Sequence, residues 1–451
     1  MLRFDEENLV SCAGLAPVMA LAERAGMSEL VTEKVEITNA PIASTGANPS
    51  GKVAAIVAGM VAGADCIDDL DVIRHGGMKR LFGGVYAPST LGSFLRSFTH
   101  GHGLQLASVL RAMLIGLAQR TPVLSGADQM TFVDIDSLLR RVYGHQKRGA
   151  RFGPAKVGGY QLLLRGLSPL VVTISTRLAA PVIAAIRLRG GNAGSSRGAA
   201  SLLAQALVTA KAAGARGMIL VRADSAYYAG TVVSAARRAG ALFSITVVAN
   251  TAIRAAIAAI AEDAWAPVHY PGAVEDPDTG ALISDAEVAE TVYTAFAGTR
   301  HEYTARLVVR RVKDKNNDDA LFPVWRYHAF LTNTTLSTVE SDLTHRQHAI
   351  IETTFADLID GPLAHLPSGR FDANAAWVVC AAIAHNLLRA AGTLTSTFHA
   401  KARGATLRKH LVCVPARLAR PQGRPVLHLP EHWPWAEAFT SLHTATGPPA
   451  A

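Results

Sequence analysis

The chain has 451 residues, 49% of them hydrophobic, which excludes a disordered protein and allows more than one globular domain. Its 44 Lys and Arg against 35 Asp and Glu give a net charge of +9, which favours a polyanionic partner without separating DNA from RNA or anionic lipid. Four scattered cysteines, at positions 12, 66, 380 and 413, fit neither a CxxC zinc site nor a secreted disulfide framework.

The N-terminal sequence MLRFDEENLV carries acids at once and lacks the basic-then-apolar order of a signal peptide. No apolar run reaches the roughly 18 residues that cross a bilayer. We therefore expect a cytoplasmic protein that does not act with a membrane.

Residues 1–125 are predicted to form a helical N-terminal domain, because segments such as VAAIVAGMVAGA are apolar and amphipathic at helical spacing. A domain that binds DNA ends and a domain that only packs against the rest of the chain both remain open, since no clean helix-turn-helix pattern is present.

From about residue 126 the sequence predicts an α/β core. MTFVDIDSLL, VVTIS, PVIAAIRL and GMILVRAD are strand candidates, and SLLAQALVTAKAAG is a helix candidate. Strands that alternate with a helix are typical of α/β folds. We assign residues 126–240 to the first part of this core.

The remaining sequence divides into three parts. Residues 241–340 are predicted to be a β-rich insertion, with strand candidates such as YTARLVVRRV and VWRYHAFLTN. Residues 341–395 return to helices, the first being LTHRQHAIIETTFADLID, so they are expected to complete the core. Residues 396–451 form a basic C-terminal extension that either follows DNA phosphates or is simply solvated.

The distribution of acids between positions 136 and 224 is unusual. This interval contains fourteen Lys and Arg and no Asp or Glu. A surface that faces nucleic acid would exclude carboxylates except those needed to hold a metal, although chance in an Ala- and Arg-rich sequence gives the same pattern.

Four acids are candidates for metal ligands. Asp134 and Asp136 alternate with apolar residues, so both carboxylates leave the same face of a strand. Asp224 follows an apolar strand run, at the end of the strand where α/β sheets place ligands. Glu352 lies in a helix apolar enough to be partly buried. Taken singly, capping, turn or solvated roles explain each acid equally well.

Together the acids indicate phosphodiester chemistry. Hard divalent cations bridged by carboxylates activate a water or a 3′-hydroxyl and stabilise the leaving oxygen during in-line attack on a phosphodiester.

Several motifs resemble the DDE transposases of bacterial insertion sequences, most closely the insertion-sequence 1380 group. The similar segments are FVDID with YGHQKRGA downstream, LVRADSAYY, HRQHAIIE followed by GPLAHLPSGRFDANAAW, AHNLLRAAG, and the N-terminal GANPSGKVAAIVAGMVAGADCIDDLDVIRHGGM. They extend over most of the chain.

The resemblance implies an RNase H-like catalytic core, interrupted by the β-rich insertion and preceded by the helical N-terminal domain. It implies Asp136, Asp224 and Glu352 as catalytic metal ligands for Mg²⁺ or Mn²⁺, with two ions expected, and Asp134 as a neighbour that supports or replaces Asp136. It also implies a protein that works on bacterial nucleoid DNA.

The family pattern further suggests where DNA would be contacted. Related transposases carry a Tyr, an Arg, the Glu and a Lys on one face of the glutamate helix. Here these positions are His345, His348, Glu352 and Ile359, so two fixed positive charges are absent. The residues expected to contact DNA are Lys147, Arg148, Arg151, His345, Arg346 and His348.

The leading hypothesis is a transposase that binds the terminal inverted repeats of its element, cleaves there and joins the freed strand to target DNA. Pairing two element ends requires at least two active sites, so a homodimer is expected on DNA. The alternatives are a degenerate transposase that binds DNA without cutting, favoured by Ile359, and an RNase H-like nuclease without transposition. A glycoside hydrolase is disfavoured, because aromatic residues make up only 6% of the sequence.

Overall fold

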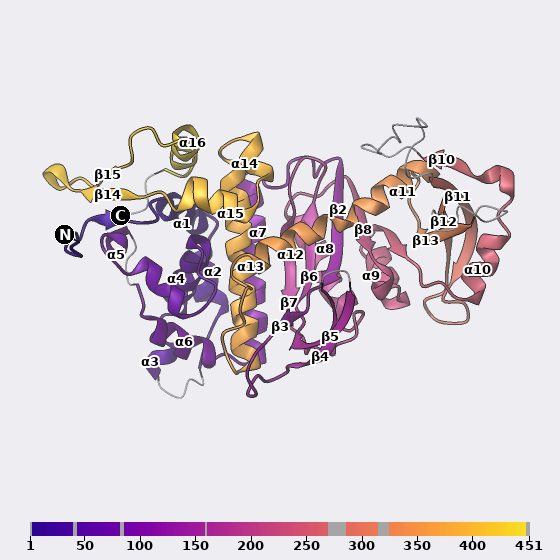
Figure 1. Ribbon diagram of the computed structural model, residues 1–451, viewed down its shortest axis with the longest axis horizontal. Helices are drawn as coiled ribbons and strands as arrows, with labels where there is room; N and C mark the ends of the chain where they lie inside the picture. The colour runs from indigo at the N-terminus through magenta and orange to yellow at the C-terminus, as the bar shows by residue number, and fades with distance from the viewer. Residues whose placement is uncertain are drawn as a thin grey trace.

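The computed structural model describes residues 2–38, 43–81, 85–157, 160–268, 286–313 and 324–447. The molecule is elongated: N-terminal helices lie at one end, a large sheet in the middle, and the last strands of that sheet at the other end (Figure 1). It is a mixed α/β structure.

The N-terminal part is helical, apart from the short strand β1 (Leu9–Val10). Its helices are α1 (Leu15–Arg24), α2 (Met27–Lys34), α3 (Ala43–Gly46), α4 (Pro49–Ala62), α5 (Met78–Leu81), α6 (Pro88–Arg96) and α7 (His100–Arg120), with a 3-10 turn at Asp68–Ile73. Helix α4 begins where the Asn48 side chain accepts a hydrogen bond from the Gly51 amide and Pro49 occupies the first turn. It ends at Gly63, whose φ of 116° favours glycine.

A nine-stranded mixed sheet dominates the middle of the molecule. Its order is β10-β11-β12-β13-β9-β8-β2-β6-β7. The strands are β2 (Met130–Ser137), β6 (Leu170–Ser175), β7 (Val182–Arg187), β8 (Met218–Ala223), β9 (Leu242–Thr246), β10 (Ala266–Val268), β11 (Ala286–Ala295), β12 (Tyr303–Lys313) and β13 (Trp325–Thr332). Strand β8 runs parallel to both β2 and β9, and the other neighbouring pairs are antiparallel.

Helices cover the central strands. Helix α8 (Ala199–Ala212) packs against β2, β6 and β7, and α12 (Ile351–Ile359) packs against β2. Helix α9 (Gly230–Arg238) packs against α8 and β9, and α10 (Thr251–Ala258) against β11. Strand β6 is buried at every residue and β8 at all but its first, which explains why their sequences are apolar without alternation.

Helix α13 (Phe371–Thr393) joins the N-terminal helices to the sheet. It packs against α4 and α7 on one side and against β7 on the other. The buried Asn386 amide pairs with the backbone of Ile183 in β7, accepting from its N–H at 2.8 Å and donating to its carbonyl at 2.9 Å. This side chain therefore satisfies backbone groups at the edge of the sheet.

The expectation that no helix is long and apolar enough to cross a membrane was wrong on length and composition. Both α7 and α13 pass that test. In α13, however, 94% of the most apolar window is buried inside the protein, against 39% in α7. The long apolar sequence of α13 is therefore explained by its burial in the protein core.

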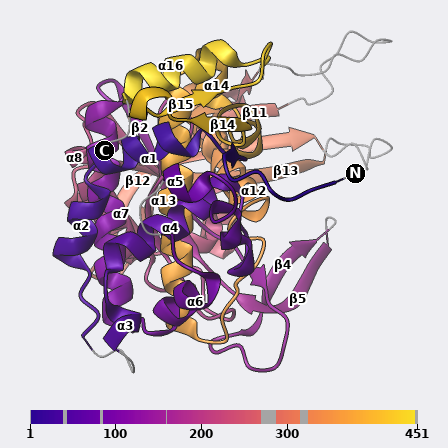
Figure 2. The same cartoon turned by 90° about the vertical axis from the view of Figure 1, so that its left-hand side faces the viewer.

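A second sheet, of three strands, lies between Asp136 and Asp224, in the interval that contains no Asp or Glu. Its order is β3-β5-β4, formed by β3 (Arg140–Arg141), β5 (Tyr160–Leu167) and β4 (Arg151–Val157). Figure 2 shows β4 and β5 projecting at the lower right of the molecule. The sequence did not predict this hairpin, because exposed apolar side chains such as Leu163, which is 70% exposed, interrupt the alternation of polar and apolar residues.

The basic C-terminal segment is folded against the N-terminus as far as residue 447. It contains α14 (Thr397–Lys401), α15 (Gly404–Leu407), a π-helical turn at Arg408–Val412, β14 (Ala416–Ala419), β15 (Val426–His428) and α16 (Ala436–Thr446). Strand β14 pairs with both β1 and β15, and α16 packs against α1. Figure 1 shows these yellow elements above the indigo N-terminal helices.

Candidate active site

The fold brings three of the four candidate acids together. Strands β2 and β8 are parallel neighbours with Asp134 paired to Arg222, and continuing this register by two residues leads to Asp136 and Asp224. Helix α12 packs against β2 and carries Glu352 in its first turn. The negative charges of Asp224 and Glu352 act on Asp136, so the three acids lie near one another. Their ligand atoms do not, however, all lie within 4.8 Å of one another in the described chain.

Asp136 is the most perturbed of these acids. Burial, reinforced by the repulsion of Asp224 and Glu352, raises its pKa from 3.8 to about 7. The amide of Ser137 donates to its Oδ1 at 2.6 Å and opposes the rise. A cation between the acids would relieve this repulsion, so the donor set fits a hard divalent metal.

Asp224 stands directly after β8, at the start of a 3-10 turn formed by Ser225–Tyr227. Its carboxylate accepts a hydrogen bond from the amide of Ala226 at 3.0 Å, so it caps this turn as well as facing the site. The residue is open to solvent on one side. Burial of its other side raises its pKa, and the nearby His348 opposes that rise.

Asp134 has a different role from Asp136, although both leave the same face of β2. It is 1% exposed, and both of its oxygens accept from Arg222, at 2.7 and 2.8 Å. A further nitrogen of Arg222 donates to the carbonyl of Thr344 at 2.9 Å. Burial raises the pKa of Asp134 and Arg222 opposes that effect. Because both oxygens are engaged, this geometry favours Asp136 as the metal ligand.

His345 does not lie where DNA could reach it, contrary to the sequence-based expectation. It is 6% exposed, its ring stacks on Phe330 at 4.1 Å, and its two nitrogens contact the hydroxyls of Ser244 and Thr246. Burial lowers its pKa to about 3, so the ring is neutral. His345 therefore packs α11 (Thr338–Arg346) against the sheet.

His348 lies beside the acids. Its Nδ1 contacts the carbonyl of His345 at 2.7 Å, and its ring is 5.0 Å from that of His345. It acts electrostatically on both Asp224 and Asp134. Arg346, two residues earlier, is exposed.

The other predicted DNA contacts lie in the loop between β3 and β4 and at the start of β4. Arg148 and Arg151 are exposed. Lys147 is half-buried, and its ammonium donates to the carbonyl of Leu366 at 2.7 Å. Burial lowers its pKa. The three side chains are thus not equivalent, and Arg148 and Arg151 are the more accessible.

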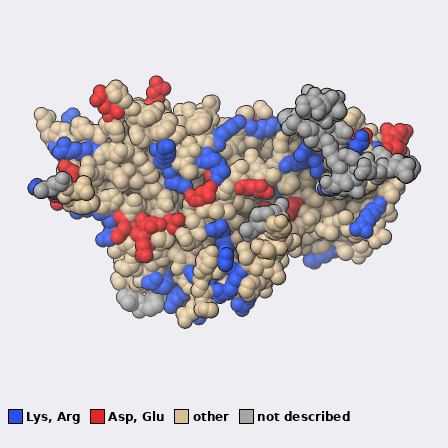
Figure 3. Space-filling model, viewed as in Figure 1, with Lys and Arg blue, Asp and Glu red and all other residues tan. Residues whose placement is uncertain are grey.

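A cleft of about 720 Å³ opens between α6 and β3. Its basic lining residues are Arg96, Arg140, Arg141 and Lys147, and Asp68 is an acid in the same wall. Figure 3 shows that Lys and Arg are spread over several parts of the face it displays, whereas Asp and Glu gather over the N-terminal helices and along the middle. The charged residues that line the cleft are therefore mainly basic.

Two residues near the acids were not predicted from the sequence. Arg189 is 7% exposed and acts electrostatically on Asp136, while its guanidinium donates to the carbonyls of Gly194, Ser195 and Arg197. Tyr227 is fully buried, and Ser137 and Arg189 are among the polar groups that act on its hydroxyl. The sequence offered one signal for Tyr227, its position three residues after Asp224.

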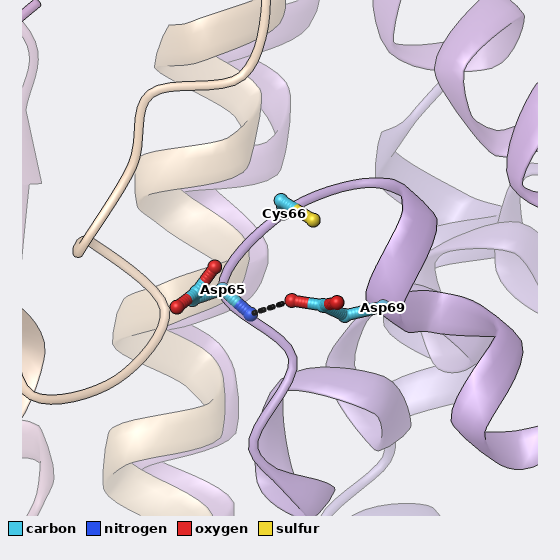
Figure 4. Close-up of side chains that lie close together, drawn as sticks. All are labelled: Asp65, Cys66 and Asp69. Carbon is cyan, nitrogen blue, oxygen red and sulfur yellow. Dashed lines mark hydrogen bonds between the residues drawn. The ribbon is translucent and has the colours of Figure 1, made fainter.

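Elsewhere in the described chain, Asp65, Cys66 and Asp69 place ligand atoms within 4.8 Å of one another. Figure 4 shows the Asp69 carboxylate directed at the amide of Asp65, while the Asp65 carboxylate turns away from the other two side chains. It turns instead to the ring of His365, at 2.9 Å. These acids are thus engaged in local hydrogen bonds, and the cluster is not assigned as a metal centre.

Comparison with known proteins identifies the family of the chain. No curated protein sequence matches the chain. The family described as "Transposase DDE domain group 1" matches residues 1–446, nearly the whole length. The chain therefore belongs to the group 1 family of DDE transposase domains.

Proposed function

We propose that this protein is an insertion-sequence transposase, resembling the insertion-sequence 1380 group, which cleaves DNA at the ends of its element and transfers the strand to target DNA. The observation that carries the proposal is the electrostatic effect of Asp224 and Glu352 on Asp136, which indicates that the three acids lie near one another within a DDE transposase domain. The protein would act on nucleoid DNA in the bacterial cytoplasm.

The strand order supports an RNase H-like core. Counting β2, β6, β7, β8 and β9 as the first to fifth strands, the sheet reads 3-2-1-4-5, with Asp136 on the first strand and Asp224 after the fourth. On this assignment β10 to β13 are the insertion between the second and third acids. They extend the same sheet from β9.

The three acids would hold Mg²⁺ or Mn²⁺, with two ions bridging them. Such ions supply the activation of a water or a 3′-hydroxyl and the stabilisation of the leaving oxygen. Asp136 and Asp224 would be fixed ligands, because each has one carboxylate oxygen held by a backbone amide. The ion pair between Asp134 and Arg222 would hold β2 and β8 in register beneath them.

DNA would follow the exposed basic side chains near the site. Arg148, Arg151 and Arg346 are accessible. Arg140, which lines the cleft beside β3, lies four residues after Asp136 in the sequence. Contacts to phosphate would make binding salt-dependent. Two copies of the chain would be needed to pair two element ends, so a homodimer is proposed on DNA.

The test is metal-dependent nicking of a duplex that carries the element ends. We expect Asp136→Asn, Asp224→Asn and Glu352→Gln each to lower the nicking rate by about 10³-fold or more, since each removes a charged ligand from the metal site. Binding of the same duplex, measured by gel shift, should persist in all three variants. Glu437→Gln, which changes an exposed glutamate on α16, is the matched control and should cut normally.

The result also separates the rivals. A wild-type chain that binds the ends but never nicks them, with Mg²⁺ or Mn²⁺, would be a degenerate transposase, as the replacement of the family lysine by Ile359 suggests. Nicking of any duplex without end preference and without strand transfer would identify a nuclease instead.

A further inference from the structure

The ribbon formed by β4 and β5 exposes large apolar side chains on both of its faces. Phe152 is 64% exposed and Leu163 is 70% exposed. Leu163 is paired with Pro154, two residues after Phe152, so Phe152 and Leu163 lie on one face. The alternation of strand side chains puts Leu162 and Tyr160, which are 46% and 76% exposed, on the other face. A two-stranded ribbon with both faces in water is marginally stable, so these side chains indicate a surface that meets a partner.

The base of this ribbon is fixed near the three acids. Strand β3, which pairs with β5, begins at Arg140, four residues after Asp136. The Arg140 guanidinium donates to the carbonyl of Ala364 at 2.8 Å, in the segment that follows the helix of Glu352. Against the ribbon, a Cβ at Gly191 would lie 2.2 Å from backbone carbonyl oxygens of both β4 and β5. The ribbon is therefore held tightly at its base, while the strands project from the molecule (Figure 2).

The charge of the ribbon and its surroundings favours DNA as the partner. Residues 137–223 contain no Asp or Glu. Arg148, which precedes β4, and Arg151, which begins it, are both exposed. Arg141 is also exposed, and its guanidinium lies 4.8 Å from the centre of the exposed Tyr143 ring. A symmetric contact between two copies through this surface would bring like charges together, whereas DNA phosphates would neutralise them.

The apolar side chains indicate which part of the DNA they meet. Phosphates and the edges of the bases are polar or charged, so they suit the arginines and not Phe152 or Leu163. The faces of the bases are apolar enough to pack on such side chains, but in a duplex they are stacked on one another. Phe and Leu side chains reach these faces by entering between two base pairs, which unstacks the pairs and kinks the duplex. Exposed apolar side chains flanked by arginines are typical of such a wedge.

We propose that the ribbon of β4 and β5 is a wedge that opens the DNA beside the cleavage site, with Phe152 and Leu163 entering between neighbouring base pairs. Arg148 and Arg151 hold the adjacent phosphates, and the kink brings the strand toward Asp136. The inference rests on the proposed function, because it requires a bound element end. It gives the ribbon a role in distorting DNA that is separate from the chemistry at the acids.

The test measures metal-dependent nicking by the double variant Phe152→Ala/Leu163→Ala on two kinds of duplex that carry the element ends. One duplex is fully paired, and the others have a short mismatch on either side of the cleavage site. The control is the double variant Phe398→Ala/Val208→Ala, which removes side chains of matched exposure, 61% and 70%, from α14 and α8. Thermal unfolding checks that both variants are folded.

On the paired duplex, Phe152→Ala/Leu163→Ala should nick about 10- to 100-fold more slowly than wild type, because the variant no longer helps to open the base step. On the duplex whose mismatch lies at the wedged step, the rate should return to within about threefold of wild type, since mismatched bases are already easier to unstack. Phe398→Ala/Val208→Ala should nick every duplex at the wild-type rate. Rescue by the mismatch separates a wedge from a surface that only adds binding affinity.

Wild-type nicking of the paired duplex by Phe152→Ala/Leu163→Ala, or an equal loss on paired and mismatched duplexes, would overturn the inference and leave the proposed cleavage intact. Sedimentation of the full-length chain without DNA tests the other kind of partner. A wild-type dimer that becomes monomeric in this double variant would assign the ribbon to a contact between copies and overturn the wedge. Wild-type protein that nicks no duplex, or nicking that persists in Asp136→Asn, would overturn the proposed function, and this inference with it.

Discussion

Asp134 and Asp136 show how two residues of one type on one face of a strand acquire different roles. Asp134 is enclosed with Arg222, whereas Asp136 is two residues nearer the strand end and faces two other acids. The alternation of apolar and acidic residues predicted the shared face. It could not predict the ion pair, because Arg222 lies 88 residues away in sequence.

This difference predicts a stability effect at Asp134. Replacing Asp134 with Ala leaves the Arg222 guanidinium buried without its counter-charge, so the free energy of unfolding should fall by about 3–5 kcal/mol in urea titrations. Under conditions where the variant is folded, Mn²⁺ affinity should stay at the wild-type value. If Asp134→Ala is as stable as the wild type, or if the folded variant loses Mn²⁺ binding, Asp134 would instead be a metal ligand.

The pKa of Asp136 predicts how the metal-free protein responds to pH. A carboxyl with a pKa of about 7 in the folded chain, against 3.8 ordinarily, binds more protons folded than unfolded. Unfolding free energy should therefore fall as pH rises from about 4 to about 7, by up to roughly 4 kcal/mol from this group. Asp136→Asn should flatten that slope and be more stable than wild type at about pH 8. An unchanged slope in urea titrations of the variant would contradict the assignment.

The helical segment that carries Glu352 is not continuous, although the sequence predicted one continuous helix. One continuous helix was expected over LTHRQHAIIETTFADLID, with His345, His348 and Glu352 on one face. The structure instead interrupts it with a 3-10 turn at Gln347–Ile350, between α11 and α12. Four residues at 3.0 rather than 3.6 per turn rotate the following face by roughly 80°. His345 is consequently buried against β9, while Glu352 is exposed beside Asp136.

Periodicity predicted the elements whose local sequence agrees with their environment. The strands around FVDID, VVTIS, PVIAAIRL and GMILVRAD and the helix over Ala199–Ala212 are all present, because their apolar patterns match their burial. Helix α10 was missed inside the region expected to be β-rich. It begins at Thr251, after the N-cap Asn250, whose side chain accepts a hydrogen bond from the Ile253 amide. Only Ile253 of this helix is buried, so its sequence carries little core-facing pattern.

At the scale of the whole molecule, the two chain ends form one unit. The amides of Ala13 and Gly14 donate to the carbonyls of Val414 and Val412, at 2.9 and 3.1 Å. A Cβ at Gly14 would lie 1.7 Å from the Leu411 carbonyl oxygen, so only glycine permits this approach. Such contacts join residues about 400 positions apart, which no local pattern could predict.

This junction predicts a specific cross-link. The thiols of Cys12 and Cys413 lie 3.9 Å apart, although these residues are scattered in the sequence and predicted no disulfide framework. Added hydrogen peroxide should take one hydrogen from each thiol, giving a disulfide and two waters. The bond should raise the free energy of unfolding by about 2–4 kcal/mol, and a reductant should reverse the gain.

Peptide mapping without reductant identifies the bond, and urea titrations measure its effect. The Cys413→Ser variant is the control and should show neither the linked peptide nor the gain, while Cys66→Ser should show both. Oxidised wild-type protein that yields no linked peptide, or a linked peptide with no gain in stability, would mean that the two ends separate readily in solution. The packing of β14 and α16 on the N-terminal elements argues against that outcome, because opening the junction would expose buried residues such as Val10 and Leu442.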